Sequence, residues 1–196
     1  MLTLQELLEP LARRRTDQVV VTTMAAVRPW GMLSRHELDF ASADSAMGHA
    51  ADLALGIALA RPDRRVICIN GDGSMLMSLG TLVTIAALAP TNLILFVVEN
   101  GTYEITGNQP VPGSGRTSLA GMAREAGFPC VFRFDDAEVY EASLGALLAA
   151  DGPTFAGVAV APGHEPPISR GPHESAPYLR TSLAASARRV RDALLR

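Results

Sequence analysis

The sequence predicts an α/β fold with a doubly wound, mostly parallel sheet and helices on both faces. Short apolar runs alternate along the chain with longer segments of helical character, which is the order that βαβ units produce. The two most apolar runs, at 66–70 and 93–99, do not alternate between polar and apolar residues. Such continuous runs indicate strands covered on both faces, as in a parallel sheet between two helical layers.

Length and composition limit the class of protein. The chain has 196 residues, 48% of them hydrophobic and 19% charged, with a formal net charge of −3. We therefore expect one domain over 1–196, with 162–196 as a C-terminal extension, and no nucleic acid as partner. No signal peptide is visible, and no apolar run reaches the roughly 18 residues of a membrane span. With two cysteines, Cys68 and Cys130, both expected as small buried hydrophobes, a cytoplasmic protein without a membrane partner is predicted.

The predicted elements alternate in order along the chain. Strands are expected where β-branched or continuous apolar residues occur, at 18–23, 66–70, 93–99, 130–134 and 154–160. Helices are expected at 3–15, 47–60, 75–88, 118–126, 136–150 and from about 181.

The first helix should begin at a capping box, because Thr3 precedes Glu6 by three positions. Pro10 lies inside the same pattern and predicts a kink or a late helix start. After the first strand, residues 25–39 contain helix breakers and are expected to be irregular, with a short helix beginning at Ser34.

The middle of the chain carries the more specific features. The helix over 47–60 is rich in small residues, which suit close packing against a sheet or a partner helix. The strand at 66–70 leads into a tight turn at 71–74. The loop over 100–117 is rich in Gly, Pro, Asn and Thr and is long for a compact domain, and long loops are often functional.

The turn at 71–74 reads Gly-Asp-Gly-Ser between a buried strand and a helix, at the sheet edge where open α/β folds bind ligands. Its glycines let backbone N–H groups approach an anion, and the following helix adds its positive end. A P-loop would need a Lys followed by Ser or Thr, and a dinucleotide fingerprint would need Gly in place of Leu76. The turn therefore predicts a different kind of phosphate site.

An acidic residue within a phosphate site is explained by a bridging cation. Mg²⁺ is usually held by one or two protein oxygens together with substrate phosphates, and Asp72 offers such a carboxylate. The next predicted strand, 93–99, leads directly into Asn100, whose amide oxygen is a second ligand. Because one crossover helix can place these strands side by side, we expect Asp72 and Asn100 to be neighbours.

This pattern, with Gly101 following Asn100, resembles the diphosphate-binding motif of thiamine diphosphate enzymes. The resemblance implies thiamine diphosphate and Mg²⁺ as cofactors, with Asp72, Asn100 and the backbone carbonyl of Thr102 as metal ligands. Glu99 stands where the family has a first Asn. The cofactor-binding residues implied are Ser45, Met47, Gly71, Gly73, Ser74, Asn100, Thr102 and Tyr103.

Two of these residues concern the shape of the cofactor. In the family, a bulky apolar residue wedges between the two rings of the cofactor and enforces a bent conformation, and Met47 occupies that position. A core methionine at a helix start is the alternative interpretation. Two residues earlier the family usually has Gly, whose carbonyl accepts from the cofactor's 4′-amino group; here the residue is Ser45.

Several segments carry a more specific resemblance: MGHA at 47–50, LALGIALARPDR at 53–64, GDGSMLM at 71–77, LVTIAALAPTNLI at 82–94 and the loop 100–110. Over roughly residues 1–175, the chain resembles the β subunit of sulfopyruvate decarboxylase and the matching half of phosphonopyruvate decarboxylase. The resemblance implies decarboxylation of a small 2-oxo acid with a sulfonate or phosphonate at C3. Thr106 stands where many pyruvate decarboxylases carry a carboxylate, which argues against simple pyruvate chemistry.

The resemblance also implies that part of the active site comes from another polypeptide. In the family, the glutamate that activates the cofactor belongs to a separate pyrimidine-binding domain, so no catalytic residue is expected in this chain. The nearby acidic candidates, Glu37 and Glu104, do not suit that role. A pyrimidine-binding α subunit is therefore expected as partner in a hetero-oligomer. A carboligase subunit of the acyloin or acetolactate type and a non-catalytic cofactor-binding subunit remain as alternatives.

The four histidines are the last candidates. His36 and His49 flank the wedge and could face substrate, although a structural or surface role is expected for both. His164 and His173 lie in a Pro-rich segment and are expected to be exposed, and their spacing lacks a zinc pattern.

Overall fold

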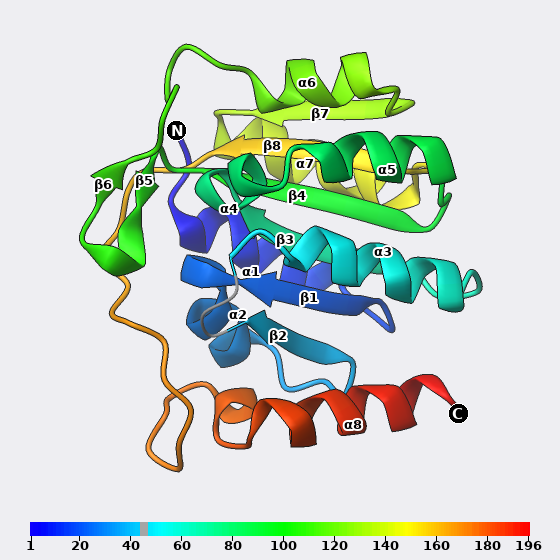
Figure 1. Cartoon of the computed structure of the whole chain (residues 1–196), viewed down its shortest axis with the longest axis vertical. Helices are drawn as coiled ribbons and strands as arrows, with labels where there is room; N and C mark the ends of the chain where they lie inside the picture. Colours follow the sequence, from blue (N-terminus) through cyan, green and yellow to red (C-terminus); the bar gives the residue numbers. More distant parts are fainter. Residues whose placement is uncertain (44–46) are drawn as a thin grey trace.

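The computed structural model describes residues 1–43 and 47–196, and its centre is a six-stranded sheet with the order β2-β1-β3-β4-β8-β7. All neighbouring strands in this sheet are parallel, and helices cover both of its faces (Figure 1). The strands are β1 Val19–Thr23, β2 Asp39–Ala43, β3 Val66–Gly71, β4 Leu93–Glu99, β7 Cys130–Phe134 and β8 Thr154–Ala159. The predicted α/β fold with a mostly parallel sheet is confirmed.

The helices alternate with these strands. They are α1 Leu4–Arg14, α2 Val27–Leu33, α3 Ala50–Ala60, α4 Asp72–Met77, α5 Gly80–Leu88, α6 Leu119–Ala126, α7 Ala137–Ala149 and α8 Leu183–Leu194. Short 3₁₀ turns lie at η1 Met24–Ala26, η2 Glu104–Thr106 and η3 Pro177–Leu179. No helix in the described chain is both long and apolar enough to cross a membrane.

Two hydrophobic cores lie on opposite faces of the sheet and explain the continuous apolar strands. In β3, Ile67 and Ile69 belong to the core under α1, α2 and α7. Val66 and Cys68 of the same strand belong to the core under α3, α5 and α6. Successive side chains of a strand point to opposite faces, so a strand covered on both sides is apolar at every position. Cys68 is fully buried, as expected, whereas Cys130 is only half-buried.

The first helix begins at the predicted capping box, in which Thr3 and Glu6 each accept a hydrogen bond from the other's backbone N–H. It includes Pro10 and starts at Leu4, so the predicted late start is wrong. The proline is buried.

The segment 25–39, predicted to be irregular, holds two ordered elements, α2 and the start of β2, and the short helix ends before Ser34 instead of beginning there. The first residue of β2, Asp39, is fully buried, which conceals the strand in the sequence. Its carboxylate accepts hydrogen bonds from Trp30 Nε1 at 3.1 Å and Ser34 Oγ at 2.5 Å, and Arg15 lies 3.3 Å away. These tertiary partners offset the cost of burying a charge, and pattern alone does not reveal them.

The helix predicted over 75–88 is two helices, and the first of them starts three residues earlier, at Asp72. The helical conformation is interrupted between Met77 and Gly80. After the break, Thr81 Oγ1 donates to Asp52 on α3 at 2.5 Å. The interruption therefore aligns α5 with α3 on one face of the sheet, where both helices lie in Figure 1.

Candidate active site

A cavity of about 330 Å³ lies where the carboxyl ends of β1, β3 and β4 meet. In the sheet order, the strand that follows β1 in the chain, β2, lies on one side of β1, whereas the strand that follows β3, β4, lies on the opposite side of β3. The connections that leave β1 and β3 therefore run to opposite sides of the sheet, which makes the gap between these two strands a topological switch point. Ligands of open α/β sheets bind at such a switch point. The cavity is lined by residues at and after the end of each strand: 23–26 for β1, 70–74 for β3, and 98, 100 and 102–106 for β4, together with Met47.

Asp72 is a buried acidic residue that lines the cavity, and only 7% of it is exposed. Its Oδ2 accepts from the N–H of Gly101 at 2.7 Å, and its Oδ1 accepts from the N–H of Gly73 at 2.7 Å. Burial raises the pKa of the Asp72 carboxyl, while these two hydrogen bonds lower it. Among the described residues, no basic side chain is hydrogen-bonded to Asp72, and a buried carboxylate of this kind is suited to a bound cation.

Asn100 lies beside Asp72, as the strand order predicted, because β3 pairs directly with β4. Its Oδ1 accepts from the N–H of Thr102 at 3.1 Å, and its Nδ2 donates to Glu104 Oε2 at 2.9 Å. An amide oxygen has two lone pairs, so Oδ1 keeps one for a metal ion. Asp72, Asn100 and the adjoining loop therefore bring together one carboxylate, one amide oxygen and the loop carbonyls.

These donors fit Mg²⁺ better than a transition metal. In the described chain, no three His, Cys, Asp or Glu side chains gather into a metal-holding group. A hard ion such as Mg²⁺ needs only one or two protein oxygens when a phosphate supplies the others. Asp72 and Asn100 meet that requirement next to a cavity lined by glycines.

Gly73 and Ser74 contact two neighbouring segments at the cavity, the loop that carries Tyr103 and the segment that carries Met47. A Cβ on Gly73 would lie 2.4 Å from Cε1 of Tyr103, so only glycine allows the tyrosine ring to cover this backbone. Ser74 Oγ accepts from the N–H of Gly48 at 2.9 Å. That bond ties the segment that carries Met47 to the start of α4.

Met47 lines the cavity and is half-buried. This position favours the wedge interpretation over a methionine buried in the core. Ser45 lies outside the described residues.

Thr23, at the end of β1, is a cavity residue that was not among the sequence candidates. Its hydroxyl is buried and has no hydrogen-bond partner in the described part of the chain. A buried polar group without a partner costs free energy, and a diphosphate oxygen in the cavity would satisfy it. The Thr-Thr pair at the end of a predicted strand was the available signal, but its place at the switch point depends on the strand order.

The remaining acidic and histidine candidates lie in other environments. Glu37 is paired with Arg196 and does not line the cavity. His49, the residue before α3, is exposed, and its Nδ1 lies 3.4 Å from Oδ2 of Asp52 in the first turn of that helix. His164 and His173 are exposed, as predicted.

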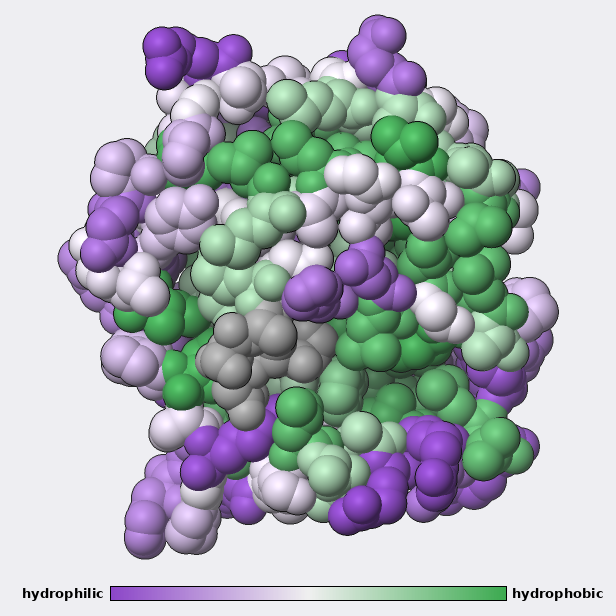
Figure 2. Space-filling model, in the orientation of Figure 1, coloured by the Kyte–Doolittle hydropathy of each residue, from purple (hydrophilic) through white to green (hydrophobic). Residues whose placement is uncertain are grey.

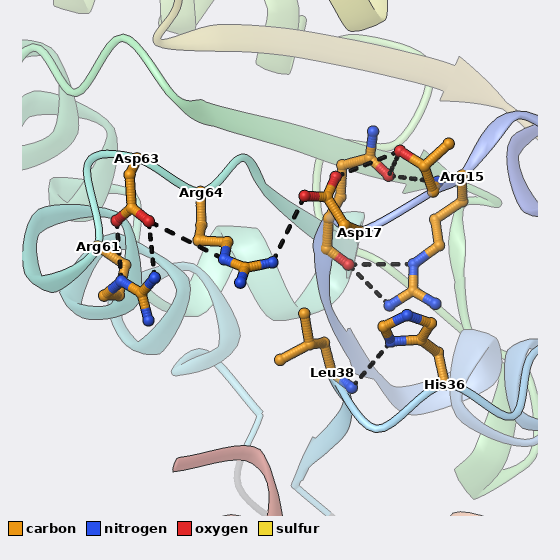
Figure 3. Close-up of polar contacts among 9 residues, drawn as sticks. Arg15, Asp17, His36, Leu38, Arg61, Asp63 and Arg64 are labelled. Atoms are coloured by element: carbon orange, nitrogen blue, oxygen red, sulfur yellow. Dashed lines mark hydrogen bonds and ion pairs between the residues drawn. The ribbon is translucent and has the colours of Figure 1, made fainter. Parts of the chain in front are cut away.

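His36 belongs to a polar cluster before the amino ends of the strands, opposite the cavity (Figure 3). Its Nδ1 accepts from the N–H of Leu38 at 3.1 Å, and burial and nearby Arg15 lower its pKa. His36 therefore has a structural role, as expected.

Comparison with known proteins agrees with this geometry. A solved structure described as a thiamin diphosphate-dependent enzyme from Mycobacterium smegmatis superimposes with a TM-score of 0.68. It shares 24% identity and covers 83% of this chain and 32% of the other. That likeness establishes the thiamine diphosphate-binding fold.

The family follows from the sequence comparison. Residues 21–158 match the model of the thiamine pyrophosphate enzyme, C-terminal TPP binding domain, and the chain belongs to this family. Thiamine diphosphate is the cofactor that defines the family.

Two relatives are informative. Phosphonopyruvate decarboxylase of Streptomyces viridochromogenes is 38% identical over 149 residues, covering 76% of this chain and 37% of the relative. Sulfopyruvate decarboxylase subunit beta of Methanothermobacter thermautotrophicus is 44% identical over 118 residues, covering 60% of each. The chain therefore spans between about a third and three fifths of these two relatives.

Proposed function

We propose that this chain is the diphosphate-binding subunit of a thiamine diphosphate- and Mg²⁺-dependent 2-oxo acid decarboxylase that works with a separate pyrimidine-binding subunit. The observation that carries the proposal is the cavity at the switch point, with buried Asp72 beside Asn100. The decarboxylases among the relatives support the reaction class.

Each lining group has a part in this proposal. Asp72, Asn100 and the Thr102 carbonyl would hold Mg²⁺, whereas Thr23, Gly73 and Ser74 would face the diphosphate. Gly71, Tyr103 and Met47 would line the rest of the cofactor site. When bound, the cofactor supplies the electron sink that lets a 2-oxo acid lose CO₂.

The need for a partner is supported by the acidic groups of the cavity. Among the described lining residues, only Asp72 and Glu104 are acidic. Asp72 is the proposed metal ligand, and Glu104 accepts hydrogen bonds from Asn100 and from the backbone of Glu165. An activating carboxylate for the pyrimidine ring would therefore come from another subunit.

An apolar face beside the cavity supports the same conclusion. We define this face by the exposed residues Leu53, Met77 and Val83 on α3, α4 and α5, and Figure 2 shows a broad hydrophobic surface there. From residue 73 to residue 98 the sequence contains no Asp, Glu, Lys or Arg. Exposed helix faces normally carry charges, and the cores of protein interfaces lack them.

The apolar face adjoins the cavity itself. A Cβ on Gly48 would lie 3.3 Å from Cβ of Met77, so Met77 sits against the segment that carries Met47. A subunit that closes the cavity from this side would cover the apolar face.

Two charged variants test the partner. Val83 on the apolar face and Val139 on α7, across the sheet, are 60% and 56% exposed. We expect Val83→Glu to abolish co-purification of the second subunit from native cells while Val139→Glu retains it. Retention by Val83→Glu, with both variants folded, would contradict the assignment of this face.

The metal and cofactor are tested with Asp72→Ala. We expect the wild-type complex to bind thiamine diphosphate in a Mg²⁺-dependent manner and the variant to lose this dependence. Undiminished Mg²⁺-dependent binding by the variant would exclude Asp72 as the metal ligand.

For the substrate, we propose a 2-oxo acid with a sulfonate or phosphonate at C3. No Arg, Lys or His lies among the described cavity residues, so the partner would supply the positive charge for that group. CO₂ release by the purified complex should be faster with sulfopyruvate or phosphonopyruvate than with pyruvate. Equal rates would contradict the substrate class, and an acyloin formed with an added aldehyde would favour the carboligase.

A further inference from the structure

The loop that carries Asn100 is held by a segment far away in the sequence. Glu104 accepts from Asn100 Nδ2 at 2.9 Å through Oε2 and from the backbone N–H of Glu165 at 2.8 Å through Oε1. Residues 162–177, which we name the strap, therefore contact the proposed metal loop directly. A Cβ on Gly163 would lie 2.7 Å from Glu104 Oε1, so a side chain at this position would obstruct the contact.

A second hydrogen-bonded path joins the same two segments. Thr102 Oγ1 donates to Asn108 Oδ1 at 2.8 Å, and Asn108 Nδ2 donates to the carbonyl of Gly163 at 3.0 Å. Asn108 has a φ of 59°, a left-handed conformation that asparagine tolerates better than most residues. Both side chains at the loop, Asn100 and Thr102, thus have partners that bind the strap.

Arg28, a partly buried residue of α2, fastens the strap to that helix. Arg28 donates to Glu165 Oε2 at 2.6 Å, to both carboxylate oxygens of Glu174 at 2.9 and 3.1 Å, and to the carbonyls of Pro166 and Pro167. These contacts match the five N–H donors of a guanidinium, which a lysine ammonium cannot reproduce. The side chains of Arg28 and Glu174 are 15% and 8% exposed.

The chemistry of Glu104 determines which way Asn100 points. A carboxylate only accepts hydrogen bonds, so it binds the NH₂ of Asn100 and directs the amide oxygen away from itself. If Glu104 were displaced, the amide could turn and present its NH₂ in place of the oxygen.

We propose that Glu104 is a positioning residue that orients the Asn100 oxygen toward Mg²⁺, and that the strap, fastened by Arg28, holds Glu104 in place. This inference rests on the proposed function. It gives the strap a role in holding the metal loop, although Glu104 and Glu165 are 61 residues apart in the sequence.

Three variants and one control test the proposal in the complex as purified from native cells. Glu104→Gln keeps the shape but can no longer accept at both atoms, Arg28→Met removes the clamp, and Arg28→Lys is the second clamp variant should Arg28→Met fail to fold. Arg61→Met is the control, because Arg61 pairs with Asp63 at the far end of α3.

The first readout is the Kd for Mg²⁺ at saturating thiamine diphosphate, measured by calorimetry. Loss of a residue that orients a metal ligand weakens metal binding by about 10- to 100-fold, so we expect that loss for Glu104→Gln and Arg28→Met and none for Arg61→Met. A double variant, Glu104→Gln with Arg28→Met, should lose no more than the stronger single variant, because Arg28 is proposed to act on Asn100 through Glu104.

The second readout is hydrogen exchange of residues 100–110 in the cofactor-free protein. Exchange there should be faster in Glu104→Gln and Arg28→Met, with β3 and β4 unchanged. If the wild type binds the cofactor, an unchanged Mg²⁺ affinity in Glu104→Gln and Arg28→Met would overturn the proposal, and so would additive losses in the double variant.

A wild type that binds no thiamine diphosphate would overturn the proposed function instead. Hydrogen exchange would then be the test of whether the strap holds the metal loop. Equal exchange of residues 100–110 in wild type and Arg28→Met would overturn that part of the proposal.

Discussion

Two helical glycines differ in what a methyl group would contact, and this difference gives a prediction of opposite sign. Gly56 lies inside α3, and a Cβ there would have no atom within 4 Å. Gly73 lies in α4, where a Cβ would be 2.4 Å from Cε1 and 2.9 Å from Cδ1 of Tyr103. Replacing glycine by alanine inside a helix stabilises it by about 0.5–1 kcal/mol.

Gly56→Ala should therefore raise the free energy of unfolding by about 0.5–1 kcal/mol. For Gly73→Ala the same helix gain is opposed by displacement of the Tyr103 ring, and overpacking costs about 1–3 kcal/mol. The difference is a net loss of about 1 kcal/mol, or roughly 2–4 °C in Tm for a chain of this size.

Removing the ring should reverse the sign. In a Tyr103→Ala background the two closest contacts are gone, and the third, with Val111 Cγ2, is longer at 3.1 Å. Gly73→Ala should then be neutral or stabilising, by up to about 1 kcal/mol.

Urea unfolding of the wild type and of these single and double variants, at constant m value, measures each step. A stabilising Gly73→Ala in the wild-type background would refute the steric reasoning. So would an undiminished loss when Tyr103 is absent.

Three further predictions concern contacts away from the cavity. Asn92 Nδ2 donates to three backbone carbonyls at and after the end of α3, so Asn92→Ala should lower the free energy of unfolding, measured by thermal unfolding, by about 1–3 kcal/mol. Asn92→Asp places a carboxylate against those carbonyls and should lower it further. A loss for Asn92→Asp that is equal to or smaller than the loss for Asn92→Ala would contradict these contacts. The Tyr178 hydroxyl contacts Thr22 Oγ1 at 2.9 Å and the Val27 carbonyl, so Tyr178→Phe should lose about 1–3 kcal/mol in urea unfolding, whereas no loss would show that these contacts are dispensable. Arg28 lowers the pKa of Glu174 from 4.5 to about 2, so its stabilisation is complete above pH 4.5 and disappears as the pH falls toward 2. The stability difference between wild type and Glu174→Gln, followed by unfolding at several pH values, should shrink over that interval, and a constant difference would refute the pairing.

The elements that could be predicted from sequence are those whose signal is local. The apolar runs that became β3 and β4 are continuous because both faces are covered, and the capping box of α1 is complete within four residues. The Gly-Asp-Gly-Ser turn and Asn100 follow directly from strands, so their meeting at one sheet edge required only that these strands be parallel neighbours.

The elements that were missed depend on distant partners. Strand β2 begins with a buried Asp39 that is stabilised by Arg15 and Trp30, and neither contact leaves a periodic pattern. The break before α5 is matched by the contact of Thr81 with Asp52, which lies 29 positions earlier.

The sequence by itself determined the α/β class, the family and the pair of metal-ligand candidates, because each depends on residue types at short, regular spacing. Only the tertiary structure decided that Thr23 lines the cavity, that Glu104 binds Asn100 and the strap, and that an exposed apolar face lies beside the cavity. Those facts depend on which strands become neighbours and on contacts between segments far apart in the chain. Strand order and long-range contacts follow from packing of the whole domain, and no local window of residues records them.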